Sequence, residues 1–371
     1  MGVGLIALLL MGLGGWLGGL WQEQQSSAGH PQTPQPPFPY SQREVTFSSG
    51  GVELAGAVTV PQGDGPFPGV VLLSGAGPQD RDGTLAGHQR YLVLADALTR
   101  AGVAVLRYDD RGTGGSGGEL LEARFEDLAA EAGAAVELLR EQPKIDPGRV
   151  GLLGASQGSL VAGLAAREDP RLAFLVLLSP PALPGHEVWV EQQLRVAQAE
   201  GAEASDLEVM ELLLLTAFEL RTADLPEAEK HQSLEQVVEN LEQLQAGTGL
   251  QLAAGARRRI LVQALLSRQM EDALYYDPRP VLEELRLPVL ALYGSKDLQV
   301  PPSVHAPDLR TALADNPRAT VEVIPGLNHL LQPSTTGRPS EYARLEVTLA
   351  PKVLERVSRW ILDHSHPQDR P

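Results

Sequence analysis

The chain has 371 residues, a formal net charge of −17 and no cysteine. This length suffices for one large α/β domain with an insertion, or for two modest domains. The negative charge argues against a nucleic-acid partner, because phosphate binding needs a basic face. The short basic cluster Arg257–Arg259 is interpreted as a solvated helix face. The lack of cysteine excludes disulfides, thiolate metal sites and a cysteine nucleophile.

The N-terminal stretch Met1–Trp21 has no charged side chain. Its length matches a membrane span of about 20 residues, or a secretory signal. We predict an uncleaved anchor. A signal cleaved near Ser26–Ala28 and a misassigned start codon are the alternatives, because basic residues are missing and glycines weaken a helix. The following stretch, Gln22–Tyr40, is polar and proline-rich, which predicts an extended tether and not a packed element. Together these two segments predict that the protein lies outside the cytoplasm, where it is either anchored to the membrane or secreted.

From Arg43 onward, short apolar runs alternate with helical patterns. A hairpin is predicted around Gly50-Gly51. Continuous apolar strands separated by helices imply a mostly parallel sheet flanked by helices on both faces. The strands are predicted at Glu44–Ser49, Val52–Pro61, Gly69–Leu73, Val103–Tyr108, Val150–Ala155, Phe174–Leu178, Leu287–Tyr293 and Thr320–Ile324, and the helices at Gln89–Ala101, Leu120–Glu141 and Tyr342–His364.

The segment Gly185–Leu285 interrupts this alternation, since it has no convincing strand and is rich in helix formers. Its helices are predicted at Gln192–Ala204, Asp206–Arg221, Glu227–Gln245 and Arg257–Tyr275. We interpret it as a helical cap over the carboxyl edge of the sheet; a helical extension packed away from the site is the alternative. The expected organisation is therefore an anchor or signal (1–21), a linker (22–42), a core in two parts (43–184 and 286–366) and the inserted cap (185–285).

The motif Gly154-Ala-Ser156-Gln-Gly158 follows an apolar strand and precedes a helix-compatible run. A serine between strand and helix sits on a tight, strained turn with its hydroxyl exposed, and the flanking glycines remove Cβ atoms that would clash there. We therefore predict that Ser156 is a nucleophile. The alternative is a glycine turn with an incidental serine.

A serine nucleophile needs a base to take its proton and an acid to orient that base. Of the eight histidines, three lie in the tether or the C-terminal tail and three precede the last two strands, which leaves His305 and His329. We favour His329 because it lies in the loop after the last strand. His305 follows two prolines and is expected at the start of a surface helix. Asp297 follows the strand Leu287–Tyr293 and a Gly-Ser turn, so it is the predicted acid. The alternative is that Asp297 belongs to a solvated turn, where aspartate is common. The order Ser156, Asp297, His329 is that of the α/β-hydrolases.

Two backbone amides are expected to bind the oxyanion of the reaction. The amide of Gln157 begins the helix after the serine, and the amide of Ala76 lies in the small-residue loop Ser74–Gly83. Acidic and basic residues in this loop and in 109–114 are interpreted as bracing ion pairs. No coordination spacing is present for Asp80, Asp82 and Asp110, so no metal site is predicted.

Five motifs carry a family resemblance: 74–82 (SGAGPQDRD), 108–114 (YDDRGTG), 154–158 (GASQG), 294–297 (GSKD) and 328–329 (NH). With them the chain resembles the bacterial α/β-hydrolase esterases of the EstD type, related to the serine aminopeptidase-like (S33) hydrolases. The resemblance covers nearly everything after Arg43 and implies an α/β-hydrolase fold and a carboxylesterase without cofactor. It assigns Ser156, Asp297 and His329 as the triad and Ala76 and Gln157 as oxyanion donors. The cap matches no motif.

The predicted function is therefore hydrolysis of a small-molecule ester through an acyl-enzyme on Ser156. A thioesterase would use the same centre. An aminopeptidase would need cap carboxylates to hold a substrate amine, for which Glu203, Asp206, Glu208 and Glu211 are available. A non-catalytic, membrane-tethered binding protein on a hydrolase scaffold is the alternative from another class, and three retained triad side chains argue against it. The sequence carries no signal for an oligomeric state.

Overall fold

A computed structural model describes residues 30–246 and 262–365. The predicted anchor Met1–Trp21, the first part of the linker and the basic cluster 257–259 lie outside these residues. Within them, none of the helices combines the length and the apolar character that a membrane crossing requires.

The centre of the structure is a sheet of eight strands in the described residues, in the order β1-β2-β6-β3-β7-β8-β9-β10. β1 pairs antiparallel with β2, and β2 with β6, whereas the strands from β6 to β10 are parallel. The two glycines Gly50 and Gly51 form the predicted hairpin turn with positive φ angles. The bounds are β1 Tyr40–Ser49, β2 Val52–Pro61, β3 Phe67–Leu73, β6 Ala104–Tyr108, β7 Ile145–Ala155, β8 Leu175–Leu178, β9 Val289–Gly294 and β10 Ala319–Ile324.

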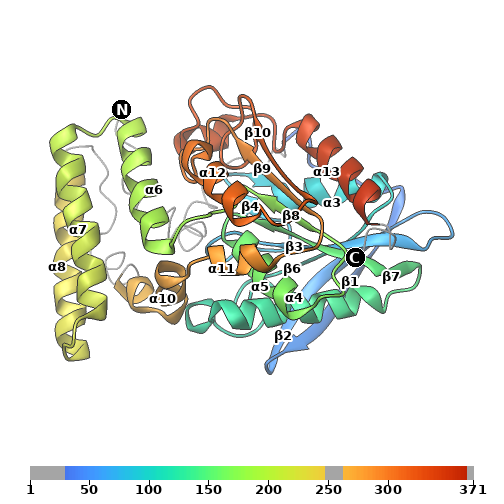
Figure 1. Cartoon of the computed structure of the whole chain (residues 1–371), viewed down its shortest axis with the longest axis horizontal. Helices are drawn as coiled ribbons and strands as arrows, with labels where there is room; N and C mark the ends of the chain where they lie inside the picture. The colour runs from blue at the N-terminus through green and yellow to red at the C-terminus, as the bar shows by residue number, and fades with distance from the viewer. Residues whose placement is uncertain (1–29, 247–261, 366–371) are drawn as a thin grey trace.

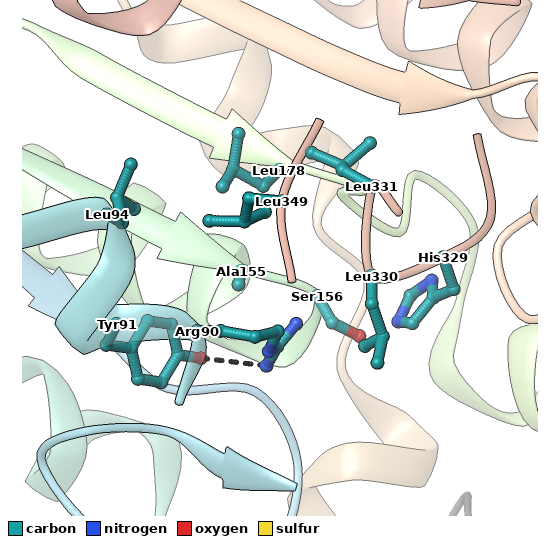
Figure 2. A pocket seen from close by; sticks show the side chains of 10 residues that line it. All are labelled: Arg90, Tyr91, Leu94, Ala155, Ser156, Leu178, His329, Leu330, Leu331 and Leu349. Carbon is teal, nitrogen blue, oxygen red and sulfur yellow. Dashed lines mark hydrogen bonds between the residues drawn. The ribbon is translucent and has the colours of Figure 1, made fainter. Parts of the chain in front are cut away.

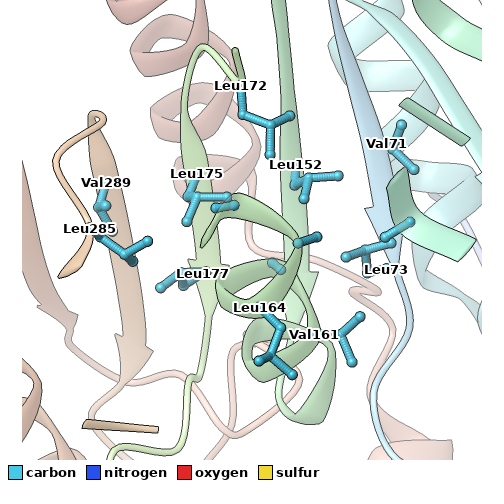
Figure 3. Close-up of a cluster of buried hydrophobic side chains, with 14 of the residues drawn as sticks. Val71, Leu73, Leu152, Val161, Leu164, Leu172, Leu175, Leu177, Leu285 and Val289 are labelled. Atoms are coloured by element: carbon cyan, nitrogen blue, oxygen red, sulfur yellow. The ribbon is translucent and has the colours of Figure 1, made fainter. Parts of the chain in front are cut away.

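Helices cover both faces of this sheet (Figure 1). One face packs against α4 (Phe125–Arg140), α5 (Gln157–Glu168), α11 (Arg279–Glu284) and α12 (Pro302–Ala312). Figure 3 shows part of this layer, where Val161 and Leu164 of α5 meet Leu152 and Leu177 of the strands. The other face packs against α3 (Arg90–Arg100) and α13 (Pro351–His364). Burial on both faces explains why the central strands are continuous apolar runs, since neither side of them meets water.

The helices between β8 and α11 form a separate cluster at one side of the molecule (Figure 1). They are α6 (Gly185–Glu200), α7 (Ala204–Thr222), α8 (Glu227–Ala246) and α10 (Arg268–Tyr275). Their buried side chains, among them Trp189, Leu214 and Leu234, form an apolar cluster of their own. α6 also reaches the sheet's carboxyl edge, because Gln192 donates to the Gln299 side chain at 3.0 Å, two residues after Asp297.

Two predicted helices are shorter in the structure. The predicted helix Leu120–Glu141 divides into a 3-10 turn, Leu120–Glu122, and α4, which begins at Phe125. The break is stabilised by carboxylates: Asp127 accepts from the amide of Arg124, and Asp272 accepts from the amide of Phe125. The closing helix begins at Pro351 and not at Tyr342, because Pro351 occupies the first helical turn, where its missing N–H costs nothing.

The end of the linker also differs from the prediction, because its described residues pack against the core. The His30 ring stacks on His88, with 3.6 Å between the ring centroids. The Gln32 side chain donates to the carbonyl of Leu349 at 2.9 Å and accepts from the amides of Thr348 and Leu349. Single side chains of this segment therefore make specific contacts with the core, although the composition of the segment is typical of a tether.

Candidate active site

Ser156 occupies a strained turn at the carboxyl end of β7. Its φ of 51° and ψ of −121° lie where a side chain is rarely tolerated, and it directly precedes α5. Its amide donates to the carbonyl of Leu178 on the neighbouring strand at 2.8 Å. This pairing holds the turn in place, so that the hydroxyl projects from the sheet edge and not into the core.

The two glycines of the motif allow backbone segments to approach more closely than any side chain would permit. A Cβ atom on Gly154 would lie 2.2 Å from the carbonyl oxygen of Gly158. A Cβ atom on Gly158 would lie 2.3 Å from the carbonyl oxygen of Ser74. The glycines are thus required for the contact between strand, helix and the loop after β3.

Asp297 and His329 follow β9 and β10, two adjacent parallel strands, so their loops leave the same edge of the sheet. Nδ1 of His329 lies 2.8 Å from Oδ2 of Asp297. Both residues are buried, Asp297 at 3% and His329 at 8% exposure. Oδ1 of Asp297 accepts from the amides of Gln299 and Val300. The carboxylate is therefore held at both oxygens, and it holds the imidazole in turn.

The backbone around His329 is fixed by polar residues, of which only Asn328 belongs to a motif singled out in the sequence. The Ser179 hydroxyl donates to the carbonyl of His329 at 3.0 Å. The side chains of Asn328 and Gln332 bond to each other, and each of these residues also bonds to the other through the main chain. The adjacent Leu331 has a φ of 60°. Ser179 and Gln332 lie outside the motifs, because Ser179 follows β8 and Gln332 acts on the loop through Asn328.

The loop Ser74–Gly83 lies against Ser156, as its predicted role requires. A Cβ atom on Gly75 would lie 3.5 Å from the Cβ atom of Ser156. The Asp110 carboxylate braces this loop, because it accepts from the Ser74 hydroxyl at 2.5 Å and from the amide of Gln79 at 2.8 Å. Burial raises the pKa of Asp110 to about 7. The amide of Gly75 donates to the Tyr91 hydroxyl at 3.2 Å.

The amides of Ala76 and Gln157 have the environment expected of oxyanion donors. Gln157 is the first residue of α5, so its N–H has no partner within the helix. In residues 30–246 and 262–365, neither of these two amides donates a hydrogen bond to another protein group. The carbonyl of Ala76 is held by the Gln79 side chain at 3.3 Å, which restrains this part of the loop.

Ser156 and His329 both line a pocket of about 340 Å³, a volume that includes open solvent at the mouth of the pocket. Figure 2 shows the Ser156 hydroxyl directed toward the His329 ring. The other lining residues come from α3, the ends of β7 and β8, the loop after β10 and the segment before α13, and most are apolar: Arg90, Tyr91, Leu94, Ala155, Leu178, Leu330, Leu331 and Leu349. The structure thus brings Ser156 and His329 to one pocket, with Asp297 behind the histidine.

His305 lies away from this pocket, near the start of α12 as the sequence predicts, but its side chain does not face solvent. It is fully buried on the inner face of α12. Its Nδ1 accepts from the amide of Ala182 at 3.2 Å, and burial lowers the pKa of the ring. Leu309, four residues later, is also buried, so the apolar spacing of α12 could have indicated which face His305 occupies.

The predicted bracing ion pairs are confirmed. Arg81 binds both oxygens of Asp109, at 3.1 and 2.8 Å, and Arg111 pairs with Glu131 at 2.6 Å. Asp82 pairs with Arg107 at 3.0 Å. Over the part of the chain that the structure describes, no group of three or more histidine, aspartate or glutamate side chains is placed to hold a metal ion.

The sheet order, the strained serine turn and the buried Asp297–His329 pair define the class as the α/β-hydrolase fold. The sequence profile of the serine aminopeptidase S33 family matches residues 83–333, more than half of the chain. The chain therefore belongs to this hydrolase family and is an enzyme.

Relatives and solved structures agree with this assignment. Esterase EstD of Thermotoga maritima is 26% identical over 360 residues, covering 96% of this chain and 76% of that protein. An uncharacterised protein of Mycobacterium tuberculosis is 32% identical over 181 residues, which is 47% of this chain and 60% of the relative. The crystal structure of Pyrococcus furiosus esterase Pf2001 superposes with a TM-score of 0.51 at 17% identity, covering 91% of this chain and 98% of the other. This structural similarity shows the shared fold.

Proposed function

We propose that this hydrolase is a serine carboxylesterase with the triad Ser156, His329 and Asp297. The observation that carries the proposal is the 2.8 Å contact between His329 and Asp297 beside a serine on a strained turn that lines the same pocket. This is the combination of nucleophile, base and orienting acid that acyl transfer requires. The similarity to esterase EstD over 96% of the chain supports an ester as the substrate.

In the proposed mechanism, His329 takes the proton of Ser156 as the hydroxyl attacks the ester carbonyl. Asp297 keeps the Nδ1 proton oriented and stabilises the imidazolium. The amides of Gln157 and Ala76 bind the oxyanion, and each such donor stabilises the transition state by about 3 kcal/mol. His329 then protonates the leaving alcohol. Water activated by the same histidine hydrolyses the acyl-enzyme and regenerates Ser156.

The pocket lining favours an ester over the aminopeptidase alternative. A peptide's N-terminal ammonium group would need a carboxylate beside the reacting carbonyl. None of the described residues that line this pocket is acidic, and one of them is Arg90. Three of the cap carboxylates considered for that role, Glu203, Glu208 and Glu211, are exposed to solvent near the start of α7. A cation near the nucleophile repels an ammonium group.

Labelling of the full-length protein with a fluorophosphonate tests the proposal. We expect the label on Ser156, hydrolysis of p-nitrophenyl acetate and butyrate, and no hydrolysis of aminoacyl anilides. Ser156→Ala abolishes both labelling and hydrolysis. Ser159→Ala is the matched control and keeps both, because Ser159 is buried and its hydroxyl donates to the carbonyl of Gly154 at 2.9 Å. Full labelling of the Ser156→Ala variant, or a preference for anilides, would overturn the assignment.

We also propose that the enzyme works outside the cytoplasm, held by Met1–Trp21 or secreted through it. The support is the uncharged composition of that stretch and the polar, proline-rich residues that follow. Cell fractionation tests this, with full-length protein expected in the membrane fraction or the medium. Protein that stays in the soluble cytosol with residues 1–21 still attached contradicts the proposal.

A further inference from the structure

Arg90 is a buried cation in the wall of the active-site pocket. It is the first residue of α3, and only 8% of its surface is exposed. It lines the same pocket as Ser156 and His329. In Figure 2 its side chain extends from α3 toward Ser156. Helix α3 thus places a positive charge in a pocket that is otherwise lined mostly by leucine side chains.

The guanidinium of Arg90 has few protein partners. It donates from Nη2 to the Tyr91 hydroxyl at 3.3 Å, and its Nε is buried without a hydrogen-bond partner. The other two buried arginines each pair with a carboxylate, Arg107 with Asp82 at 3.0 Å and Arg140 with Asp169 at 2.5 Å. In the described ranges, no carboxylate lies within ion-pairing distance of Arg90. Its charge is therefore uncompensated by this part of the protein.

A buried charge without a partner is costly, and arginine cannot avoid the cost by losing its proton. A carboxylate is the complementary ligand, because its two oxygens match the fork of guanidinium N–H groups. The leucines around the pocket offer no polar group that could compete for such an anion. The cation and the apolar walls together select a ligand that has a short apolar chain ending in a negative charge.

The position of Arg90 indicates which half of the substrate carries this charge. The leaving alcohol must lie beside His329, which protonates it. In Figure 2, Arg90 and His329 lie on opposite sides of Ser156. We propose that Arg90 binds an ionised carboxylate at the far end of the acyl group, so that the enzyme prefers half-esters of short dicarboxylic acids. This inference rests on the proposed esterase function and adds its substrate class.

A purely structural role for Arg90 predicts a different result. Its guanidinium carbon lies 5.2 Å from the centroid of the Tyr91 ring, and Tyr91 holds the loop of Gly75. If Arg90 only supports Tyr91, its removal slows hydrolysis of all esters by the same factor. Selectivity between charged and neutral esters separates the two roles.

The test compares kcat/KM of the full-length enzyme for monomethyl glutarate and for methyl valerate, which differ by a carboxylate in place of a methyl group. We expect wild type to prefer monomethyl glutarate by at least tenfold. Arg90→Met should lower this ratio by at least tenfold, and Arg90→Lys should retain part of it. The matched control is Arg100→Met at the exposed end of the same helix, which pairs with Asp96 and should leave the ratio unchanged.

Each other outcome overturns the inference. A wild-type preference for methyl valerate contradicts it even if Arg90→Met does not fold. An unchanged ratio in a folded Arg90→Met variant shows that the residue is structural. A preference for 4-acetoxybutanoate over monomethyl glutarate moves the charge to the alcohol half. Ser156-dependent hydrolysis of methyl valerate is a separate readout, so the esterase proposal stands or fails independently of the charge preference.

Discussion

Asp297 contacts His329 with one carboxylate oxygen and the protein backbone with the other. Oδ2 lies 2.8 Å from Nδ1 of His329, whereas Oδ1 accepts from the amides of Gln299 and Val300 at 2.8 Å each. Because a carboxylate can only accept, Nδ1 carries the proton and Nε2 is left free to act as the base. The two amides fix which oxygen faces the histidine.

This geometry predicts a specific effect of Asp297→Asn. The backbone amides will retain the amide oxygen of the asparagine, so its NH₂ group will face Nδ1 of His329. The histidine must then accept at Nδ1 and carry its proton on Nε2, where it cannot take the proton of Ser156. We expect kcat/KM for an ester to fall by about 10³- to 10⁴-fold with little change in Tm. Asp315→Asn, at an exposed position, is the control and should change neither value.

The two late histidines should respond differently to replacement by alanine. His329→Ala removes the proposed base, so turnover should fall by several orders of magnitude while the fold persists. His305→Ala leaves a cavity beneath α12 and an unpartnered amide on Ala182, which we expect to destabilise the protein by about 2–4 kcal/mol. Urea denaturation and ester hydrolysis, measured on both variants, separate these effects. Loss of turnover in a stable His305→Ala variant would mean that the base has been misassigned.

The proximity of Ser156, Asp297 and His329 could be predicted because these residues follow strands in a fixed order. Ser156 directly follows β7, Asp297 and His329 lie in the loops after β9 and β10, and the loops after parallel strands meet at one edge of the sheet. The helix boundaries were less predictable. Asp272 stabilises the start of α4 from 147 residues away, and no local pattern contains that contact.

Arg90 shows what the sequence could not reveal. The sequence places it at the start of a predicted helix, where a basic residue is ordinarily solvated. Its burial depends on the folding of the preceding segment, in which Thr84–Leu85 and Gln89 form a small hairpin and the Gly83 carbonyl accepts from the Arg90 amide. The burial of His305 escaped prediction for a related reason, since two prolines before a helix do not indicate which face of the helix packs inward.

Gly158→Ala should lower activity strongly. Its Cβ atom would lie 2.3 Å from the carbonyl oxygen of Ser74, so either α5 or the loop Ser74–Gly83 must move. Both displacements disturb the position of the oxyanion donors relative to Ser156, and we expect at least a hundredfold loss of kcat, since one oxyanion donor contributes about 10²- to 10³-fold.

Gly163→Ala on the same helix is the matched control for this substitution. Its Cβ atom would meet Val281 at 3.5 Å, an ordinary contact. The change should preserve activity and stabilise the helix by up to about 1 kcal/mol. Equal activity of the two variants would show that the close approach at Gly158 is not needed for catalysis.

Asp110 should make stability decline as the pH rises. Burial, together with the nearby carboxylates of Glu131 and Asp109, raises its pKa from 3.8 to about 7 in the folded protein. Between pH 3.8 and about 7 the folded state binds more protons at Asp110 than the unfolded state does. The protonated Asp110 therefore contributes to stability at low pH, and this contribution is lost as the pH rises through 7.

Asp110→Asn removes this titration and can still bond to Ser74 and Gln79. Its stability relative to wild type should therefore be higher at pH 8 than at pH 5 in urea denaturation. Asp146→Asn, near the start of β7, provides a comparison at a site away from the loop Ser74–Gly83. A relative stability of Asp110→Asn that does not vary with pH would show that Asp110 stays ionised across this range.

The contacts of Gln32 predict that the described end of the linker contributes to stability and to the pocket. Its side chain bonds to the backbone of Thr348 and Leu349, and Leu349 lines the pocket beside Ser156. We expect Gln32→Ala to lower the free energy of unfolding by about 2 kcal/mol, since three hydrogen bonds are lost and each contributes about 0.5–1.5 kcal/mol. Loosening of Leu349 should also raise KM for esters.

Truncation tests the same contacts. A chain that begins at Ser41 lacks both Gln32 and the His30 ring that stacks on His88, so it should reproduce or exceed the defect of Gln32→Ala. A chain that begins at Gly29 keeps both residues and should match the full-length protein in Tm and KM. The control substitution is Gln35→Ala, because the Gln35 side chain bonds only locally to the carbonyl of Thr33, at 3.5 Å, and its removal should change neither value. Full stability of the Ser41 chain would show that these residues rest on the core without stabilising it.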